Sequence, residues 1–205
     1  QQPMMAFTIA SSKSMLERFR SWVVAVLVML PVLVLAAEID IANPQITASE
    51  DGFVVSADFG FELNERLEEA VTKGVVLYFV TEFEMTRPRW YWLDEKVVSR
   101  NQTHRLSYHA LTRQYRLSTG GLHQSFDTLS EALRVLSRLR NWLVTDGRGE
   151  KAGVQAGDTY MAALRMRLDI NQLPRPFQIS ALGNRDWSLA SDWKVWQATL
   201  PVEAR

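Results

Sequence analysis

The chain has 205 residues, of which 47% are hydrophobic, and this suffices for one domain with a hydrophobic core but not comfortably for two. Its 23 basic residues balance its 23 acidic ones, and residues 38–205 keep a small acidic excess, which argues against nucleic-acid binding. Because the sequence has no cysteine, packing alone must hold the fold, and a thiol nucleophile, a cysteine metal site and a lipid anchor on a terminal cysteine are excluded.

The first 37 residues have the three parts of a secretion signal. Two arginines precede the uncharged run Trp22–Ala37, and small residues close it with cleavage expected after Ala36 or Ala37. The run is shorter than the about 20 residues that span a bilayer, although an uncleaved inner-membrane anchor is the alternative. We therefore expect an N-terminal extension and signal over 1–37 and a single extracytoplasmic β-rich domain over 38–205. The protein is then periplasmic, and its membrane contact is transient, through the signal only.

Alternation of apolar and polar residues dominates the remaining chain and predicts strands with one buried face. It is clearest over Phe53–Leu63, Val75–Arg87 and Tyr160–Ile170. Shorter strands are expected at 39–47, 96–100, 104–111, 113–119, 176–182 and 189–200. On the polar face of the third clear strand, Arg165, Arg167 and Asp169 indicate a solvated charge ladder with cross-strand partners.

Two segments break the alternation and predict short helices. Asn64–Lys73 ends before a glycine, which suits a helix C-cap. Thr128–Leu143 carries a leucine stripe, and Thr128 and Glu131 have capping-box spacing. Glycine-rich Thr145–Asp158 predicts a loop. Many strands and few helices indicate a mainly β (α+β) fold, an antiparallel β-sandwich-like domain with two short helices.

The most concentrated aromatic group is the run from Arg87 to Asp94. In an extended segment Trp90 and Trp92 share a face, so both can enter the core, and we expect Tyr91 to stay exposed on the other face. Clustered Trp, Tyr and Arg residues are typical of interface hot spots. The candidate interaction surface comprises Arg87, Arg89, Trp90, Tyr91 and Trp92. The alternative is a hairpin whose aromatic side chains close one end of the core.

A second candidate for this surface is the pair His109 and Arg113, which flanks a turn near Thr112. Tyr108 and His109, beside Arg113, could bind an anion or act as acid and base. No acidic residue adjoins His109 to orient its ring, so we favour the alternative, a hairpin in which the histidine ring and the tyrosine hydroxyl bind backbone. No catalytic residue is assigned.

The three histidines do not have the spacing of a metal site. His104 and His109 are five residues apart and would point to opposite faces of a strand, and His123 is expected near the tip of another loop. The sequence also lacks the G-x-S-x-G motif of a serine hydrolase and the lysine motif of a phosphate loop. We expect no metal and no cofactor.

The C-terminal stretch is rich in proline and tryptophan. Two prolines predict that Leu173–Phe177 is extended, because the residue before a proline disfavours helix. On the last expected strand Trp193 would face the core, like Trp187 before it. Trp196 would lie on the other face among charged neighbours, and it is therefore the last candidate contact residue.

Four stretches of the chain, in order, are similar to one known family. They are RPRWYWLDEKV (87–97), LSYHALTRQYRLS (106–118), FDTLSEALRVL (126–136) and LRMRLDINQLPRPFQISALGNRDWSLASDW (164–193). The chain resembles domain-of-unknown-function family 4390, exported proteins of Gram-negative bacteria. The resemblance implies no catalytic residue, because the family has no established activity. Its genes often lie near those of a nitrogen-regulation-type sensor kinase, which implies envelope signalling.

These observations favour a non-enzymatic binding or accessory domain of the bacterial envelope. Its expected partner is an envelope protein, and the resemblance points to a sensor kinase. Two alternatives stay open: an envelope hydrolase acting on a glycan or a lipid through His109, and a structural subunit of an envelope assembly. An enzyme needs a cleft where titratable groups converge, whereas a binding domain needs only an exposed aromatic or edge surface.

Overall fold

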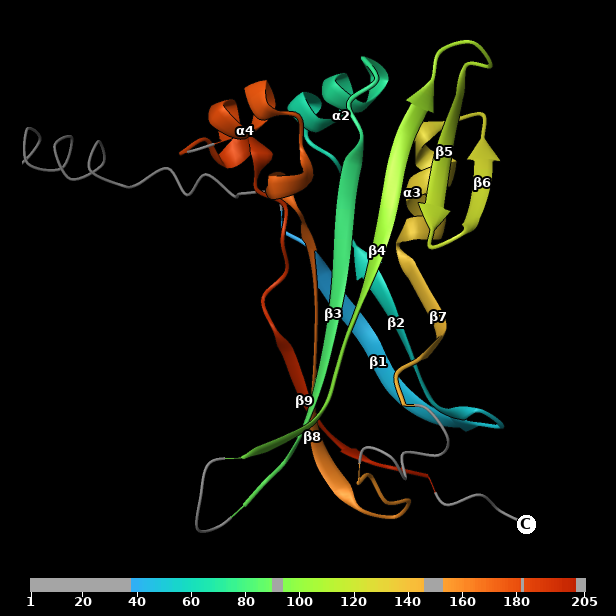
Figure 1. Cartoon of the computed structure of the whole chain (residues 1–205), viewed down its shortest axis with the longest axis vertical. Helices are drawn as coiled ribbons and strands as arrows, with labels where there is room; N and C mark the ends of the chain where they lie inside the picture. The colour runs from blue at the N-terminus through green and yellow to red at the C-terminus, as the bar shows by residue number, and fades with distance from the viewer. Residues whose placement is uncertain (1–37, 90–93, 146–152, 182, 202–205) are drawn as a thin grey trace, which may run out of the picture. The chain divides into compact units, whose positions relative to one another are not determined.

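The computed structural model describes residues 38–89, 94–145, 153–181 and 183–201, and these form two antiparallel sheets (Figure 1). The six-stranded sheet has the order β6-β5-β4-β3-β8-β9, and the three-stranded sheet has the order β1-β2-β7. The strands are β1 (Asp40–Ser49), β2 (Gly52–Gly60), β3 (Leu77–Arg87), β4 (Glu95–His109), β5 (Gln114–Thr119), β6 (Leu122–Phe126), β7 (Arg138–Leu143), β8 (Thr159–Leu168) and β9 (Lys194–Thr199). The helices are α2 (Glu65–Thr72), α3 (Leu129–Leu136) and α4 (Arg175–Ala181).

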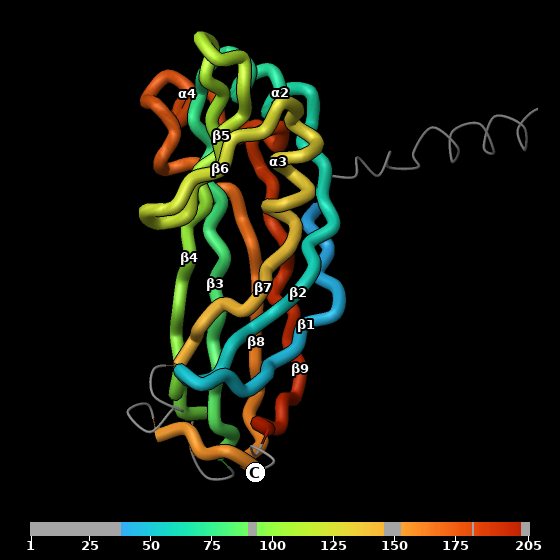
Figure 2. Tube along the Cα trace, turned by 90° about the vertical axis from the view of Figure 1, so that its right-hand side faces the viewer, coloured from blue at the N-terminus to red at the C-terminus, as the bar shows by residue number. Residues whose placement is uncertain are grey.

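The smaller sheet covers one face of the larger one. Figure 2 shows β1, β2 and β7 running across the long strands β3 and β8. Buried side chains from both sheets belong to one hydrophobic cluster, for example Val55 and Phe59 of the small sheet with Phe79, Phe83 and Tyr160 of the large one. The expected fold, an antiparallel β-sandwich-like α+β domain, is therefore confirmed.

The long strands follow the alternation in the sequence. Along β3 the side chains of Phe79, Phe83 and Met85 are buried, and Glu82 and Glu84 between them are not. β4 is one strand of 15 residues, although two strands with a gap at 101–103 were expected. The gap closes because the backbone of residues 101–103 pairs with β3 without interruption, and this pairing outweighs the weak strand propensity of asparagine and glutamine.

The first expected helix is present as α2, and Asn64 caps its start. The side chain of Asn64 accepts a hydrogen bond of 3.0 Å from the backbone N–H of Leu67, a group that the helix itself leaves without a partner. The helix buries Leu67 and Val71 against the core. Thr128 caps α3 in the same way, by accepting a bond of 3.3 Å from Glu131 N–H.

The second expected helix is only half as long as predicted. α3 ends at Leu136, and after Ser137 the chain continues as β7, so the prediction of a helix through 143 is wrong. In β7, Leu139 lies opposite Ala57 and Trp142 lies opposite Val55 of β2. Leu139 therefore enters the core from a strand, whereas Leu143 is exposed. This strand also pairs the backbone of β2 along its second edge.

Two further segments differ from expectation. Residues 175–181 form α4 instead of an extended segment and a strand at 176–182. Pro176 is tolerated because it lies in the first turn, where its missing N–H costs no helical hydrogen bond, and Gln178 N–H bonds to the carbonyl of Pro174 at 3.2 Å. His123 lies on the short strand β6, which the sequence pattern did not indicate.

The faces expected for the last strand are reversed. Trp196 lies opposite Ala162, a fully buried residue of β8, and its ring centroid is 6.4 Å from that of Phe83. Trp193 precedes β9, and 36% of its surface is exposed. Trp187 is buried, as expected. The prediction failed because it assumed one continuous strand over 189–200, whereas residues 191–193 are not part of a strand.

This reversal predicts that substitutions of Trp196 and Trp193 change the free energy of unfolding by different amounts. Trp196→Ala should lower the free energy of unfolding by about 2–4 kcal/mol, because it removes a large aromatic side chain that packs against the core. Trp193→Ala should change it by less than about 1 kcal/mol, as surface substitutions do. Urea denaturation of both variants measures the difference. A larger loss for Trp193→Ala would contradict this assignment of faces.

The segment on which export depends is not part of the described structure. The expected signal, residues 1–37, lies outside the described residues, as do Trp90, Tyr91 and Trp92. In the ranges that are described, no helix is long and apolar enough to cross a membrane. Export, removal of the signal and the exposure of Tyr91 therefore remain predictions.

Candidate functional site

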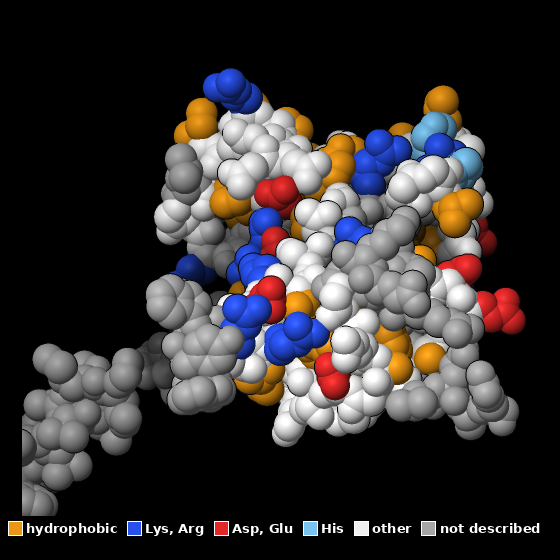
Figure 3. All heavy atoms as spheres, turned by 60° about the horizontal axis from the view of Figure 1, so that its bottom comes forward, with side chains coloured by type: hydrophobic (Ala, Val, Ile, Leu, Met, Phe, Trp, Pro, Cys, Tyr) orange, Lys and Arg blue, Asp and Glu red, His pale blue; other side chains and the backbone are white. Residues whose placement is uncertain are grey.

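The face of the six-stranded sheet that points away from the core is polar. It presents Glu82 and Glu84 on β3, Ser99 and Asn101 on β4, and Arg165 and Arg167 on β8. Strand pairing brings them together, because Glu82 lies opposite Asn101 on one side and opposite Arg165 on the other. We call this the outer face. In Figure 3, acidic and basic side chains lie next to one another on the surface instead of forming separate patches.

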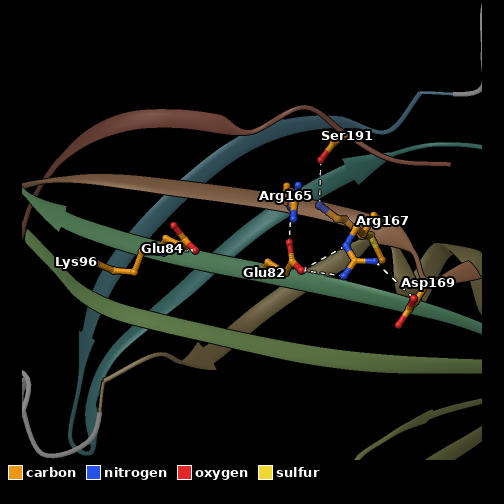
Figure 4. Close-up of polar contacts among 8 residues, drawn as sticks. Glu82, Glu84, Lys96, Arg165, Arg167, Asp169 and Ser191 are labelled. Atoms are coloured by element: carbon orange, nitrogen blue, oxygen red, sulfur yellow. Dashed lines mark hydrogen bonds and ion pairs between the residues drawn. The ribbon is translucent and has the colours of Figure 1, made fainter. Parts of the chain in front are cut away.

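Glu82 is the centre of an ion-pair network on the outer face (Figure 4). One carboxylate oxygen accepts a hydrogen bond from Nε of Arg165, and the other accepts one of 3.1 Å from Arg167. Arg167 also lies 3.6 Å from a carboxylate oxygen of Asp169. The charge ladder expected from the sequence is present, with Glu82 as its cross-strand partner.

The arginines decide the ionisation of this network. Partial burial raises the pKa of Glu82, but the hydrogen bonds from Arg165 and Arg167 lower it by more, so its pKa lies below the ordinary value. Burial likewise raises the pKa of Asp169, and hydrogen bonds from Gln172 and from Asn171 N–H outweigh that effect. Both groups are therefore ionised at neutral pH and hold no proton to donate.

A pocket of about 320 Å³ opens on the outer face beside this network. We call it the outer pocket, and its lining consists of Glu82, Phe83, Glu84, Ser99, Arg100, Asn101, Arg165 and Trp193. The guanidinium of Arg165 lies over the ring of Trp193, 4.5 Å from its centre, in a cation–π contact. The pocket is thus lined by the Trp193 ring on one side and by polar side chains of the sheet beneath.

Sequence reasoning missed the outer pocket and the role of Trp193 in it. Trp193 was expected in the core, yet Asp192 and Lys194 on either side of it were a signal for an exposed ring. The pairing of β3 with both β4 and β8 supplies the rest of the pocket, and it connects residues far apart in the chain.

The arginines of the expected interaction surface contact the chain itself. Arg87 donates hydrogen bonds to the hydroxyl of Tyr160 at 3.1 Å and to the carbonyl of Gly153 at 2.5 Å. The bond to Tyr160 is the largest of the influences that raise the pKa of Arg87. Arg89 pairs with Glu95. The contacts of Arg87 connect β3 with β8 and the segment before it, and the Arg89–Glu95 pair joins the ends of β3 and β4.

His109 and Arg113 lie at the tip of the β4–β5 hairpin, as expected. Both residues are exposed, and Nδ1 of His109 lies 3.3 Å from the hydroxyl of Thr112. Arg113 has a positive φ of 54°, which closes the turn. The structure brings this pair together with neither the outer pocket nor Trp196, which packs against the core.

His104 is the most perturbed titratable group in the described part of the chain. Burial lowers its pKa to about 4, because the imidazolium form would lose its hydration. Its Nδ1 is buried without a hydrogen-bond partner, and so are Oε1 of Gln102 and Oγ1 of Thr81 nearby on the same face of the sheet. Among the described residues no cluster of three or more histidine and acidic side chains could hold a metal ion.

With the two sheets and the outer pocket defined, the domain is a β-sandwich-like module whose outer face is polar. A family model described as "Domain of unknown function (DUF4390)" matches residues 36–197. The chain belongs to this family, and the resemblance seen in the sequence is confirmed. No curated protein and no solved structure matches the chain.

Proposed function

We propose that this protein is an exported, non-enzymatic binding domain of the bacterial envelope, and that the outer pocket is its ligand site. The outer pocket carries the proposal, because it combines an exposed tryptophan with polar side chains on a rigid sheet. Sites built on strands hold their side chains more firmly than sites on loops. A rigid polar surface beside one exposed aromatic ring is suited to binding a ligand.

The ionised carboxylates of the outer pocket favour binding over hydrolysis as its activity. A hydrolase that uses two carboxylates needs one of them protonated, with a raised pKa. Glu82 is instead held ionised by two arginines, and Glu84 pairs with Lys96 at 2.7 Å. His109, the residue on which the hydrolase alternative rested, lies at the hairpin tip outside the pocket lining.

The proposed partner is a component of the envelope. The family resemblance connects it with a sensor kinase. We expect a protein to dock on residues 87–92, where Trp90, Tyr91 and Trp92 follow Arg87 and Arg89 in the sequence. Aromatic residues next to arginine are the usual anchors of protein interfaces.

Export can be tested on the full chain. Expression in a Gram-negative host should give a periplasmic protein that begins at Ala37 or Glu38, because signal peptidases cut after small residues. N-terminal sequencing of the purified periplasmic fraction measures this. A protein that stays with the inner membrane and keeps Trp22 would overturn export with cleavage and establish the anchor.

Site-specific crosslinking tests the binding site. A photoreactive phenylalanine replaces Asn101 in the outer pocket or, as a control, Leu122, which is 80% exposed on β6. Irradiation of cells should give an adduct from position 101 and none from position 122, because only the first lies in the pocket. No adduct at 101, or equal adducts at both positions, would contradict the outer pocket as the ligand site.

A further inference from the structure

We propose that the ligand of the outer pocket is a neutral oligosaccharide. This inference rests on the proposed function, since it names the class of ligand for the same site. Three properties of the pocket lead to it: its charged side chains already have partners, its uncharged polar side chains have none among the described residues, and one side of it is an anchored tryptophan.

The carboxylates of the outer pocket are paired with arginine or lysine, and the guanidinium of Arg100 donates a hydrogen bond of 3.2 Å to the carbonyl of Val144. Glu82 binds Arg165 and Arg167, and Glu84 binds Lys96. An anionic or cationic ligand would have to displace one of these partners and leave a charge uncompensated, which is costly in a partly buried site. A neutral ligand can bind with every ion pair intact. The charge arrangement therefore selects against ionic ligands.

The uncharged polar groups remain available to a ligand. In the described residues the side chains of Ser99 and Asn101 have no hydrogen-bond partner, and both are exposed at the pocket. Arg165 uses only Nε in hydrogen bonds to the described residues, so further N–H donors are available there. Donors and acceptors are thus mixed over a small area. Sugar hydroxyls, each both donor and acceptor, match such a mixture.

Trp193 supplies the apolar contact that a sugar ring needs. Its surface is 36% exposed, and the guanidinium of Arg165 holds the ring at 4.5 Å. The chain before it is tied to β8, because the hydroxyl of Ser191 accepts a hydrogen bond of 2.9 Å from Met166 N–H (Figure 4). A preorganised ring loses little entropy on binding. The C–H groups of a pyranose can pack on such a ring while its hydroxyls reach the polar side chains of the sheet beneath.

The volume limits the length of the ligand. A pocket of about 320 Å³ is at the lower end of the range for small-molecule sites. It is open to solvent on an exposed sheet face, so part of a longer chain can continue outside it. We therefore expect recognition of a short stretch of sugar rings within an oligosaccharide.

Titration of the purified protein with defined sugars tests the inference. The neutral disaccharides N,N′-diacetylchitobiose and cellobiose are compared with chitobiose, which carries two ammonium groups, by amide chemical shifts in NMR. At least one neutral sugar should bind with a Kd of about 0.1–1 mM, and chitobiose at least about tenfold more weakly. No binding of either neutral sugar up to about 10 mM, or equal binding of chitobiose, would overturn the inference.

Two variants connect the binding to the pocket. Trp193→Ala should weaken the neutral sugar at least about tenfold, and the control Leu122→Ala should leave its Kd unchanged. A melting curve for each variant shows that it is folded. Unchanged binding by folded Trp193→Ala overturns the inference. If position 101 crosslinks in cells but no neutral sugar binds, the inference fails and the proposed function stands; if position 101 does not crosslink, the proposed function itself fails.

Discussion

Replacing Gly52 with alanine is expected to lower the free energy of unfolding by about 2–4 kcal/mol. A β-carbon built at Gly52 would lie 2.1 Å from the backbone carbonyl oxygen of Thr145, and Gly52 has φ +146°, which side chains rarely adopt. The contact cannot relax easily, because Thr145 is buried and its hydroxyl accepts a hydrogen bond of 2.9 Å from Phe53 N–H. Urea denaturation followed by circular dichroism measures the loss.

Gly121→Ala is the matched control for this substitution. Gly121 has no other atoms within 4 Å of an added β-carbon and no positive φ, so the change should stay within about 0.5 kcal/mol. Unfolding of both variants at the same urea concentration would contradict the close contact between Gly52, at the start of β2, and Thr145, just after β7.

His104 is expected to make stability depend on pH in the acidic range. Its pKa is about 4 in the folded protein, against an ordinary value of about 6.5 in the unfolded chain. As the pH falls below about 6.5, the unfolded chain binds a proton that the folded protein does not, and stability decreases until the pH reaches about 4. The loss over this window is roughly 2–3 kcal/mol, since each pKa unit corresponds to about 1.4 kcal/mol.

His104→Gln removes this group without adding a charge, and His123→Gln on exposed β6 is its control. Free energies of unfolding at about pH 7 and about pH 5 should differ less in His104→Gln than in the unchanged protein, whereas His123→Gln should keep the difference. The carboxylates held by arginine, such as Glu82, lose their stabilisation only as the pH falls through their lowered pKa values, below this interval. An unchanged difference in His104→Gln would show that His104 is not buried in its neutral form.

The sheet strands could be predicted from the sequence because alternation is a local pattern. Phe79, Phe83 and Glu82 fall on the expected faces of β3, and α2 lies within the predicted segment Asn64–Lys73. The second half of the segment 128–143 was misread because leucines spaced for a helix also fit a strand once pairing with β2 is available.

The outer pocket could not be predicted in the same way. Its parts come from β3, β4, β8 and the residue before β9, and only strand pairing places Glu82 next to Arg165 and Asn101. The position of Trp193 depended on where β9 begins, and strand ends are poorly determined by local sequence. The interaction surface at 87–92 was predicted from its composition. The structure adds that its two arginines contact other residues of the chain.

The most direct test of the central claim, that the outer pocket binds a neutral sugar without cleaving it, is a crystal structure of the protein with whichever of N,N′-diacetylchitobiose and cellobiose binds more tightly. The account predicts an intact disaccharide against Trp193, with hydroxyl groups within hydrogen-bond distance of Ser99 or Asn101 and with the Glu82–Arg165 and Glu84–Lys96 pairs unbroken. A disaccharide bound elsewhere, a cleaved sugar in the pocket, or an empty pocket at saturating sugar would contradict it.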